Sequence, residues 1–125
     1  MTRFRLPLAL LALLLAGCGG DEEQARTATT PANSTVRVVA EEYSFDPGSL
    51  VVSGAGTLTI RLRNEGSLAH NLKVRRGAET IGGTPSFPGG ESRSARLNLE
   101  HGNYEIICTV GDHADLGMTG TLRVR

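Results

Sequence analysis

Apolar and polar residues alternate through most of the chain after residue 35. Such alternation predicts β-strands that bury one face and expose the other. Gly, Pro, Asn and Asp cluster between the runs as turn signals, and no segment shows the period of an amphipathic helix. The pattern therefore predicts an all-β domain, an antiparallel sandwich or barrel. The apolar faces are Val36, Val38 and Ala40; Leu58, Ile60 and Leu62; Leu72 and Val74; Ala95, Leu97 and Leu99; Tyr104, Ile106 and Cys108; and Leu122 and Val124.

Residues 77–90 do not follow this alternation. Several Gly and Pro residues in this stretch exclude a long regular element. We expect the apolar residues Ile81 and Phe87 to pack against the core and so hold this stretch in place. We see no catalytic or metal-binding pattern within it.

The N-terminus carries the pattern of an export signal. Arg3 and Arg5 precede an apolar run over residues 6–16, which is shorter than the roughly 20 residues that cross a bilayer. Leu15-Ala16-Gly17-Cys18 follows and resembles the bacterial lipobox, in which cleavage leaves a lipid-modified cysteine. We therefore expect residues 1–17 to be a lipoprotein signal peptide, with Cys18 lipidated. The protein would be exported and anchored to the bacterial cell envelope, facing the periplasm or the cell exterior. The alternative is an ordinary signal peptide in which Cys18 has no role.

The rest of the chain divides by composition. Residues 18–34 are small and polar and predict a flexible tether, whereas residues 35–125 are long enough for one modest core. Lys plus Arg number 13 and Asp plus Glu number 13, so the formal net charge is zero. Because nucleic-acid-binding proteins carry a basic stripe, we expect no nucleic-acid partner. We expect a monomer.

Three side chains that can bind metal lie close together near the C-terminus, at Cys108, His113 and Met118, and His70 lies upstream. One thiolate, two imidazoles and a thioether are the ligands of a blue copper (type 1) site. Taken singly, each residue is more often structural than a ligand. The joint pattern nevertheless predicts one bound copper ion. A metal would also protect a lone thiol in an oxidising compartment, and the competing interpretation is a disulfide between Cys18 and Cys108.

The spacing Cys-x4-His-x4-Met with an upstream histidine resembles the cupredoxins, in particular plastocyanin- and azurin-like domains. Further similarities are Tyr43-x-Phe45-x-Pro47 in the opening strands and Tyr104, four residues before the cysteine. This resemblance covers nearly all of residues 35–125. It implies a cupredoxin-like Greek-key β-sandwich or barrel.

The same resemblance implies a role for each matching residue. His70, Cys108 and His113 would bind copper in one plane and Met118 would be the axial ligand. Asn71 would donate its backbone N–H to the cysteine sulfur and join the two ligand loops with its side chain. The carbonyl of Ala69 would approach the opposite axial position. His101 matches no ligand pattern and is expected to be an exposed turn residue.

Asp112 and Asp115 flank the loop histidine, where relatives often have Pro-Gly immediately before it. This departure suggests an acidic docking edge and favours redox protein partners with a basic surface. We expect a membrane-tethered carrier of single electrons, not an enzyme. Copper transport, storage or delivery to an oxidase is the alternative, because such proteins use the same ligand types. No Met-rich or His-rich tract is present to favour that alternative.

Overall fold

The structure is a computed structural model, and it describes residues 26–125. The predicted signal peptide and the predicted lipidation of Cys18 lie outside these residues. The described part of the chain contains no apolar helix of membrane-spanning length. It forms strands joined by turns and loops. In chain order the strands are β1 (Thr27–Thr30), β2 (Ser34–Glu41), β3 (Ser44–Asp46), β4 (Ser49–Val52), β5 (Gly56–Asn64), β6 (Lys73–Arg76), β7 (Glu79–Gly83), β8 (Ser92–Leu99), β9 (Gly102–Ile107) and β10 (Thr119–Val124).

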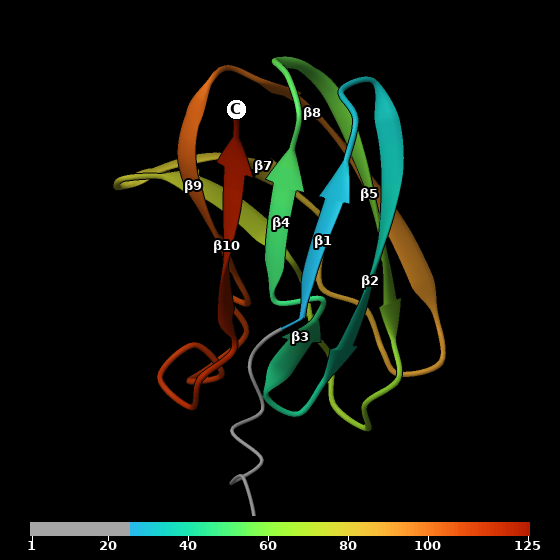
Figure 1. Cartoon of the computed structure of the whole chain (residues 1–125). Helices are drawn as coiled ribbons and strands as arrows, with labels where there is room; N and C mark the ends of the chain where they lie inside the picture. Colours follow the sequence, from blue (N-terminus) through green and yellow to red (C-terminus); the bar gives the residue numbers. More distant parts are fainter. Residues whose placement is uncertain (1–25) are drawn as a thin grey trace, which may run out of the picture.

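The strands form two sheets that pack face to face as a β-sandwich (Figure 1). The larger sheet has six strands in the order β1-β4-β10-β9-β6-β7, and the smaller has four in the order β3-β2-β5-β8. The alternating runs of the sequence coincide with β2, β5, β6, β8, β9 and β10. The predicted all-β sandwich is therefore confirmed.

The sheets are not purely antiparallel, which corrects one expectation. Strand β4 runs parallel to both β1 and β10, and β2 runs parallel to β5. Parallel neighbours need a crossover rather than a hairpin. Here the chain crosses between the two sheets after β1, β3, β4, β5, β7 and β8, so strands that are distant in sequence become neighbours.

A single apolar core fills the space between the sheets. Most of its members are the inward-facing residues of the alternating runs, and Phe45, Leu50, Val52, Phe87 and Met118 complete it. Burying each large side chain contributes roughly 1.5–3 kcal/mol relative to leaving it exposed. The core also continues to the end of the sandwich that holds the predicted metal ligands. Fully buried members include Leu50, Leu58, Ile60, Leu62, Leu72, Ile106, Met118 and Leu122.

The folded unit begins earlier than the sequence suggests. Strand β1 pairs with β4 over four residue pairs, from Thr27 with Ser49 to Thr30 with Val52, and Ala28 packs against the core. The predicted tether is therefore wrong from Thr27 onward, and so is a domain boundary at residue 35. Small polar residues can extend a sheet through backbone hydrogen bonds, without contributing a large apolar face.

Residues 77–90 contain the short strand β7 and a buried anchor. Phe87 is 2% exposed, as predicted, but Ile81 is 36% exposed and does not reach the core. Phe87 forms an isolated β-bridge with His70 through two backbone hydrogen bonds of 3.1 and 3.2 Å. This stretch therefore supports a predicted ligand, a role that the sequence did not reveal.

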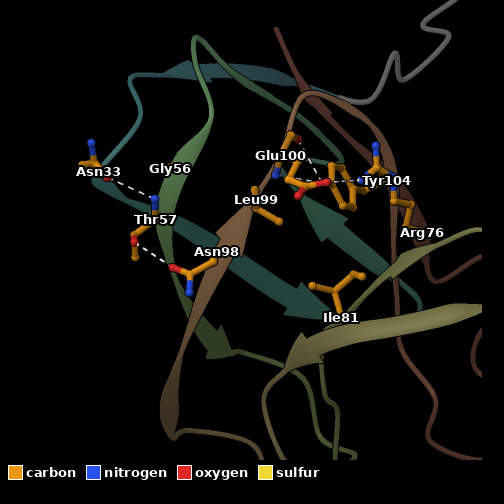
Figure 2. Close-up of a pocket in the computed structure, with 9 residues that line it drawn as sticks. All are labelled: Asn33, Gly56, Thr57, Arg76, Ile81, Asn98, Leu99, Glu100 and Tyr104. Carbon is orange, nitrogen blue, oxygen red and sulfur yellow. Dashed lines mark hydrogen bonds and ion pairs between the residues drawn. The ribbon is translucent and has the colours of Figure 1, made fainter.

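The turn between β8 and β9 closes the opposite end of the sandwich. The Tyr104 hydroxyl donates to the carbonyl of Glu100 at 2.9 Å and accepts from its N–H at 3.0 Å, which forms a tyrosine corner. The Arg76 guanidinium lies 5.1 Å from the centre of the tyrosine ring (Figure 2). Arg76, Ile81 and Tyr104 are among the residues that line a pocket at this end of the sandwich, and Figure 2 shows Ile81 at its edge. Since β9 runs from this turn toward Cys108, the pocket is remote from the predicted metal ligands.

Candidate metal centre

Strand pairing brings the C-terminal ligands together. Cys108 directly follows β9 and Met118 directly precedes β10, and these strands form an antiparallel pair that starts at Ile107 and Thr119. The Cys108 N–H donates to the Met118 carbonyl at 3.1 Å, which continues the ladder by one step. Met118 in turn donates its N–H to the His113 carbonyl at 3.1 Å. The loop therefore folds back on itself, and backbone hydrogen bonds hold its three predicted ligands close to one another.

Potential ligand atoms of His70, Cys108 and His113 lie within 4.8 Å of one another. The cysteine Sγ is 3.9 Å from Nδ1 of His70 and 3.6 Å from Nδ1 of His113. Exposure of these residues is 0% for His70 and Cys108 and 7% for His113, and Met118 is fully buried. The two imidazoles therefore converge on one buried thiol through the same ring nitrogen.

Glu42 contacts the outer side of His70. Its Oε1 lies 3.0 Å from Nε2 of the imidazole, and it also accepts from the N–H groups of Ser67 at 2.9 Å and Leu68 at 2.8 Å. The Leu68 N–H lowers the pKa of the Glu42 carboxyl most, and His70 and Ser67 lower it further, although burial opposes the shift. An ionised carboxylate only accepts hydrogen bonds, so Nε2 carries the ring proton and Nδ1 offers its lone pair to the site.

Glu42 was not predicted from the sequence as a residue of the site. Its position offered one signal, since it directly follows β2, and β2 is parallel to the strand that leads into the His70 loop. Parallel neighbours end at the same edge of a sheet, so Glu42 and the loop after Asn64 had to be near one another. The crossover that makes these strands parallel was not visible in the alternation pattern.

Asn64 organises the same loop from inside. It is fully buried, and its side-chain amide donates to the carbonyls of Leu68 at 2.9 Å and Phe87 at 3.1 Å. Its Oδ1 accepts from the Gly66 N–H at 2.9 Å. A buried amide with these partners fixes the path of the backbone before His70. No pattern in the sequence indicated this role for Asn64.

Asn71 joins the two ligand loops, as predicted. Its Nδ2 donates to Oγ1 of Thr109 at 2.8 Å, and its Oδ1 accepts from the Thr109 N–H, also at 2.8 Å. The expected N–H donation from Asn71 to the cysteine sulfur is not found. Within residues 26–125, the Sγ contacts with polar groups are those to the two imidazoles. Ala69 is exposed, and the approach of its carbonyl to the site stays a prediction.

His113 lies closest to the surface among the predicted ligands. Its ring packs edge-on against Tyr43, with ring centroids 5.1 Å apart, and lies 4.9 Å from the His70 ring. Asp112 and Asp115 are exposed on either side in the sequence, as expected for an acidic edge. The nearby loops also expose apolar side chains that were not predicted, Leu68 at 44% and Leu116 at 52%. His101, by contrast, is an exposed turn residue, as expected.

The donors fit copper better than the alternatives. A buried thiolate and two imidazoles suit both Cu(I) and Cu(II), and a thioether at the adjacent position is typical of type 1 copper. Zinc accepts Cys and His ligands, but a neighbouring methionine is not among its usual ligands. Cys108 is buried and forms no disulfide with any residue of the described range 26–125, which leaves its sulfur available as a ligand.

Solved structures with this fold include three that are informative. Auracyanin from the photosynthetic bacterium Roseiflexus castenholzii superimposes with a TM-score of 0.67 at 19% identity, over 75% of this chain and 98% of that one. Auracyanin A, a "blue" copper protein from Chloroflexus aurantiacus, gives 0.65 at 25% identity, over 77% and 100%. Rusticyanin from Thiobacillus ferrooxidans gives 0.65 at 21% identity, over 79% and 82%. No protein-family model and no curated protein matches the sequence.

These similarities, together with the strand order, show that the chain has the cupredoxin fold. The residues that the sequence singled out lie together, in the β9–β10 loop and the loop before β6. The arrangement is a site for one type 1 copper ion.

Proposed function

We propose that this protein is a blue copper electron carrier that passes single electrons between redox proteins. The observation that carries this proposal is the convergence of His70, Cys108 and His113 on one buried point. Copper bound there would supply a one-electron redox couple, Cu(II)/Cu(I). The protein's own contribution is to hold the donors, exclude water and give the electron a short route to the surface.

The protein holds the donors rigidly in both loops. The histidine before β6 is fixed on one side by Glu42 and by its bridge to Phe87, and the cysteine and methionine are fixed by the ladder of β9 and β10. A rigid ligand set changes little when the ion changes charge, which favours fast electron transfer. His113, at 7% exposure, gives the shortest route from the ligands to a partner.

The surface around His113 supports docking of a protein partner. Leu68 and Leu116 expose apolar side chains on the two loops that carry His70 and His113, and Asp112 and Asp115 add negative charge. Apolar contacts contribute affinity, and complementary charges speed the encounter. We propose partners that present an apolar patch with a basic rim.

We further propose that the domain is tethered to a membrane through a lipid on Cys18. The lipobox-like sequence supports this, and the eight peptide links from Cys18 to Arg26 reach at most about 26–29 Å. Thr27 and Thr121 both pair with Ser49, so the start of β1 lies at the same end of the sandwich as the ligand loop (Figure 1). The copper end would then stay near the membrane surface, which favours partners located there.

Copper delivery to an oxidase is the second candidate function. A delivery site exchanges its metal with a partner and benefits from exposed ligands. Here three predicted ligands, His70, Cys108 and Met118, are 0% exposed and His113 is 7% exposed, which favours retention of the ion. A chelator should therefore remove copper slowly, while a redox dye should reduce and reoxidise it reversibly.

The test is the visible spectrum of the purified protein after Cu(II) is added. We expect an intense thiolate-to-copper charge-transfer band that Cys108→Ser abolishes. The matched control is His101→Ala, which removes an exposed histidine outside the site and should leave the band unchanged. A band that persists in Cys108→Ser, or a colourless wild-type protein, would contradict the proposal.

A further inference from the structure

The most unusual contact outside the predicted ligand set is the Glu42 carboxylate. All three of its hydrogen bonds end on one oxygen, Oε1, which accepts from His70 at 3.0 Å, Ser67 at 2.9 Å and Leu68 at 2.8 Å. The imidazole is fully buried, whereas the glutamate side chain is 29% exposed. A negative charge is therefore held against the outer nitrogen of a buried ligand.

The backbone is shaped to admit this carboxylate. A Cβ added to Gly66 would collide with Oε1 of Glu42 and would lie 2.9 Å from Oε2. Only a hydrogen atom at residue 66 leaves the oxygen free to reach the Ser67 and Leu68 N–H groups. The Gly66 N–H is itself fixed by the buried Asn64, so the loop cannot easily retreat.

We propose that Glu42 is a positioning residue that orients His70 and lowers the reduction potential of the copper site. This inference rests on the proposed copper-binding function. The carboxylate keeps the ring proton on Nε2, so the lone pair of Nδ1 faces Cys108, 3.9 Å away. It also makes the imidazole more electron-rich, which favours the more highly charged oxidation state of a metal bound to it.

The magnitude follows from what such outer contacts do in metal sites. Removing a partner of a ligating histidine typically changes metal affinity 10- to 100-fold. Loss of the charge should weaken Cu(II) more than Cu(I), because the ligand then supports less positive charge. A roughly tenfold loss of Cu(II) affinity relative to Cu(I) raises a one-electron potential by about 59 mV.

Glu42→Gln is the most direct test, because the amide oxygen can still accept hydrogen bonds at the position of Oε1 while the charge is removed. The measurement is the reduction potential of the copper-loaded protein, with the visible spectrum as a check on the ligand set. We expect the reduction potential to rise by about 59 mV, which corresponds to a tenfold loss of Cu(II) affinity relative to Cu(I). The blue band should be retained. The matched control is Glu41→Gln, which removes one exposed charge at the preceding residue and should change the potential little.

Gly66→Ala gives an independent test if Glu42→Gln folds poorly. The added methyl group should push the carboxylate away without removing its charge from the chain, and the potential should again rise. In the metal-free wild-type protein, nitrogen NMR should find the His70 proton on Nε2. Gly66→Ala should redistribute it toward Nδ1.

The outcomes separate this inference from the proposed function. If the variants bind copper with the blue band but keep the wild-type potential, Glu42 has no tuning role and the carrier function stands. A rise as large in Glu41→Gln would also refute the inference, because the effect would then be one of general surface charge. If the wild-type protein gives no blue band, the proposed function itself fails. Metal-free NMR that finds the His70 proton on Nδ1 would refute the orientation argument alone.

Discussion

Removing the Asn71 side chain should loosen the connection between the two ligand loops. Asn71→Ala deletes both reciprocal hydrogen bonds to Thr109, each 2.8 Å long, and Asn71 is only 4% exposed. A typical intramolecular hydrogen bond contributes about 0.5–1.5 kcal/mol, so the pair should contribute about 1–3 kcal/mol. For a domain of this size each kcal/mol corresponds to roughly 4–8 °C in Tm. We therefore expect Tm to fall by about 4–24 °C.

The assay is thermal unfolding of the metal-free protein, followed by circular dichroism. Metal-free protein is required because bound copper would stabilise the folded state and mask the loss. Thr109→Val removes the hydroxyl acceptor but keeps the N–H, so it should cost about half as much. The matched control is Asn98→Ala, which loses one exposed hydrogen bond to Thr57 and should change stability by about 0.5 kcal/mol or less. Equal Tm values for Asn71→Ala and wild type would refute the reasoning.

Two further predictions concern backbone packing and pH. Gly120→Ala would place a methyl group against the Gly48 carbonyl, and backbone cannot move aside cheaply, so we expect a loss of about 1–3 kcal/mol in urea unfolding. Thr119→Ala, an exposed neighbour, should be close to neutral, and an equally stable Gly120→Ala would show that β10 can shift. The folded-state pKa of Glu42 lies below its ordinary value of 4.5, so the unfolded chain binds its proton first as pH falls. The stabilisation of the folded state by ionised Glu42 should be present above that value and lost as the pH falls below it. Glu42→Gln lacks this ionisable group, so its free energy of unfolding should fall less steeply in acid than that of the wild type. Equal slopes for the two proteins would contradict this prediction.

Much of the sandwich follows from the sequence because its buried faces alternate cleanly. Leu58, Ile60 and Leu62 could only be one face of a strand, and all three are fully buried. Strand β1 was missed because Thr27 and its neighbours pair through the backbone, which leaves no apolar pattern to detect. The parallel pairings were missed for a related reason, since alternation describes one strand at a time and not its neighbours.

The predicted ligands were accessible to sequence reasoning because sulfur and imidazole donors are rare in this chain, and their spacing is specific. The groups that support them were not. Glu42 and Asn64 are common residue types, and their roles depend on which oxygen or nitrogen meets which loop. Such contacts arise from the three-dimensional path of the His70 loop, so only the structure reveals them.

The position of β1 has a practical consequence for work with this domain. Strand β4 lies between β10 and β1, so its backbone hydrogen-bonding groups are covered on both sides. A shortened protein that starts at residue 35 would lack β1. The backbone of Leu50, Val51 and Val52 would then lose its hydrogen-bonding partner on that side, and β4 would become an exposed apolar edge strand. Bare edges of this kind recruit strands from other molecules and promote aggregation. Expression of the domain should therefore start before Thr27, so that each molecule caps its own sheet.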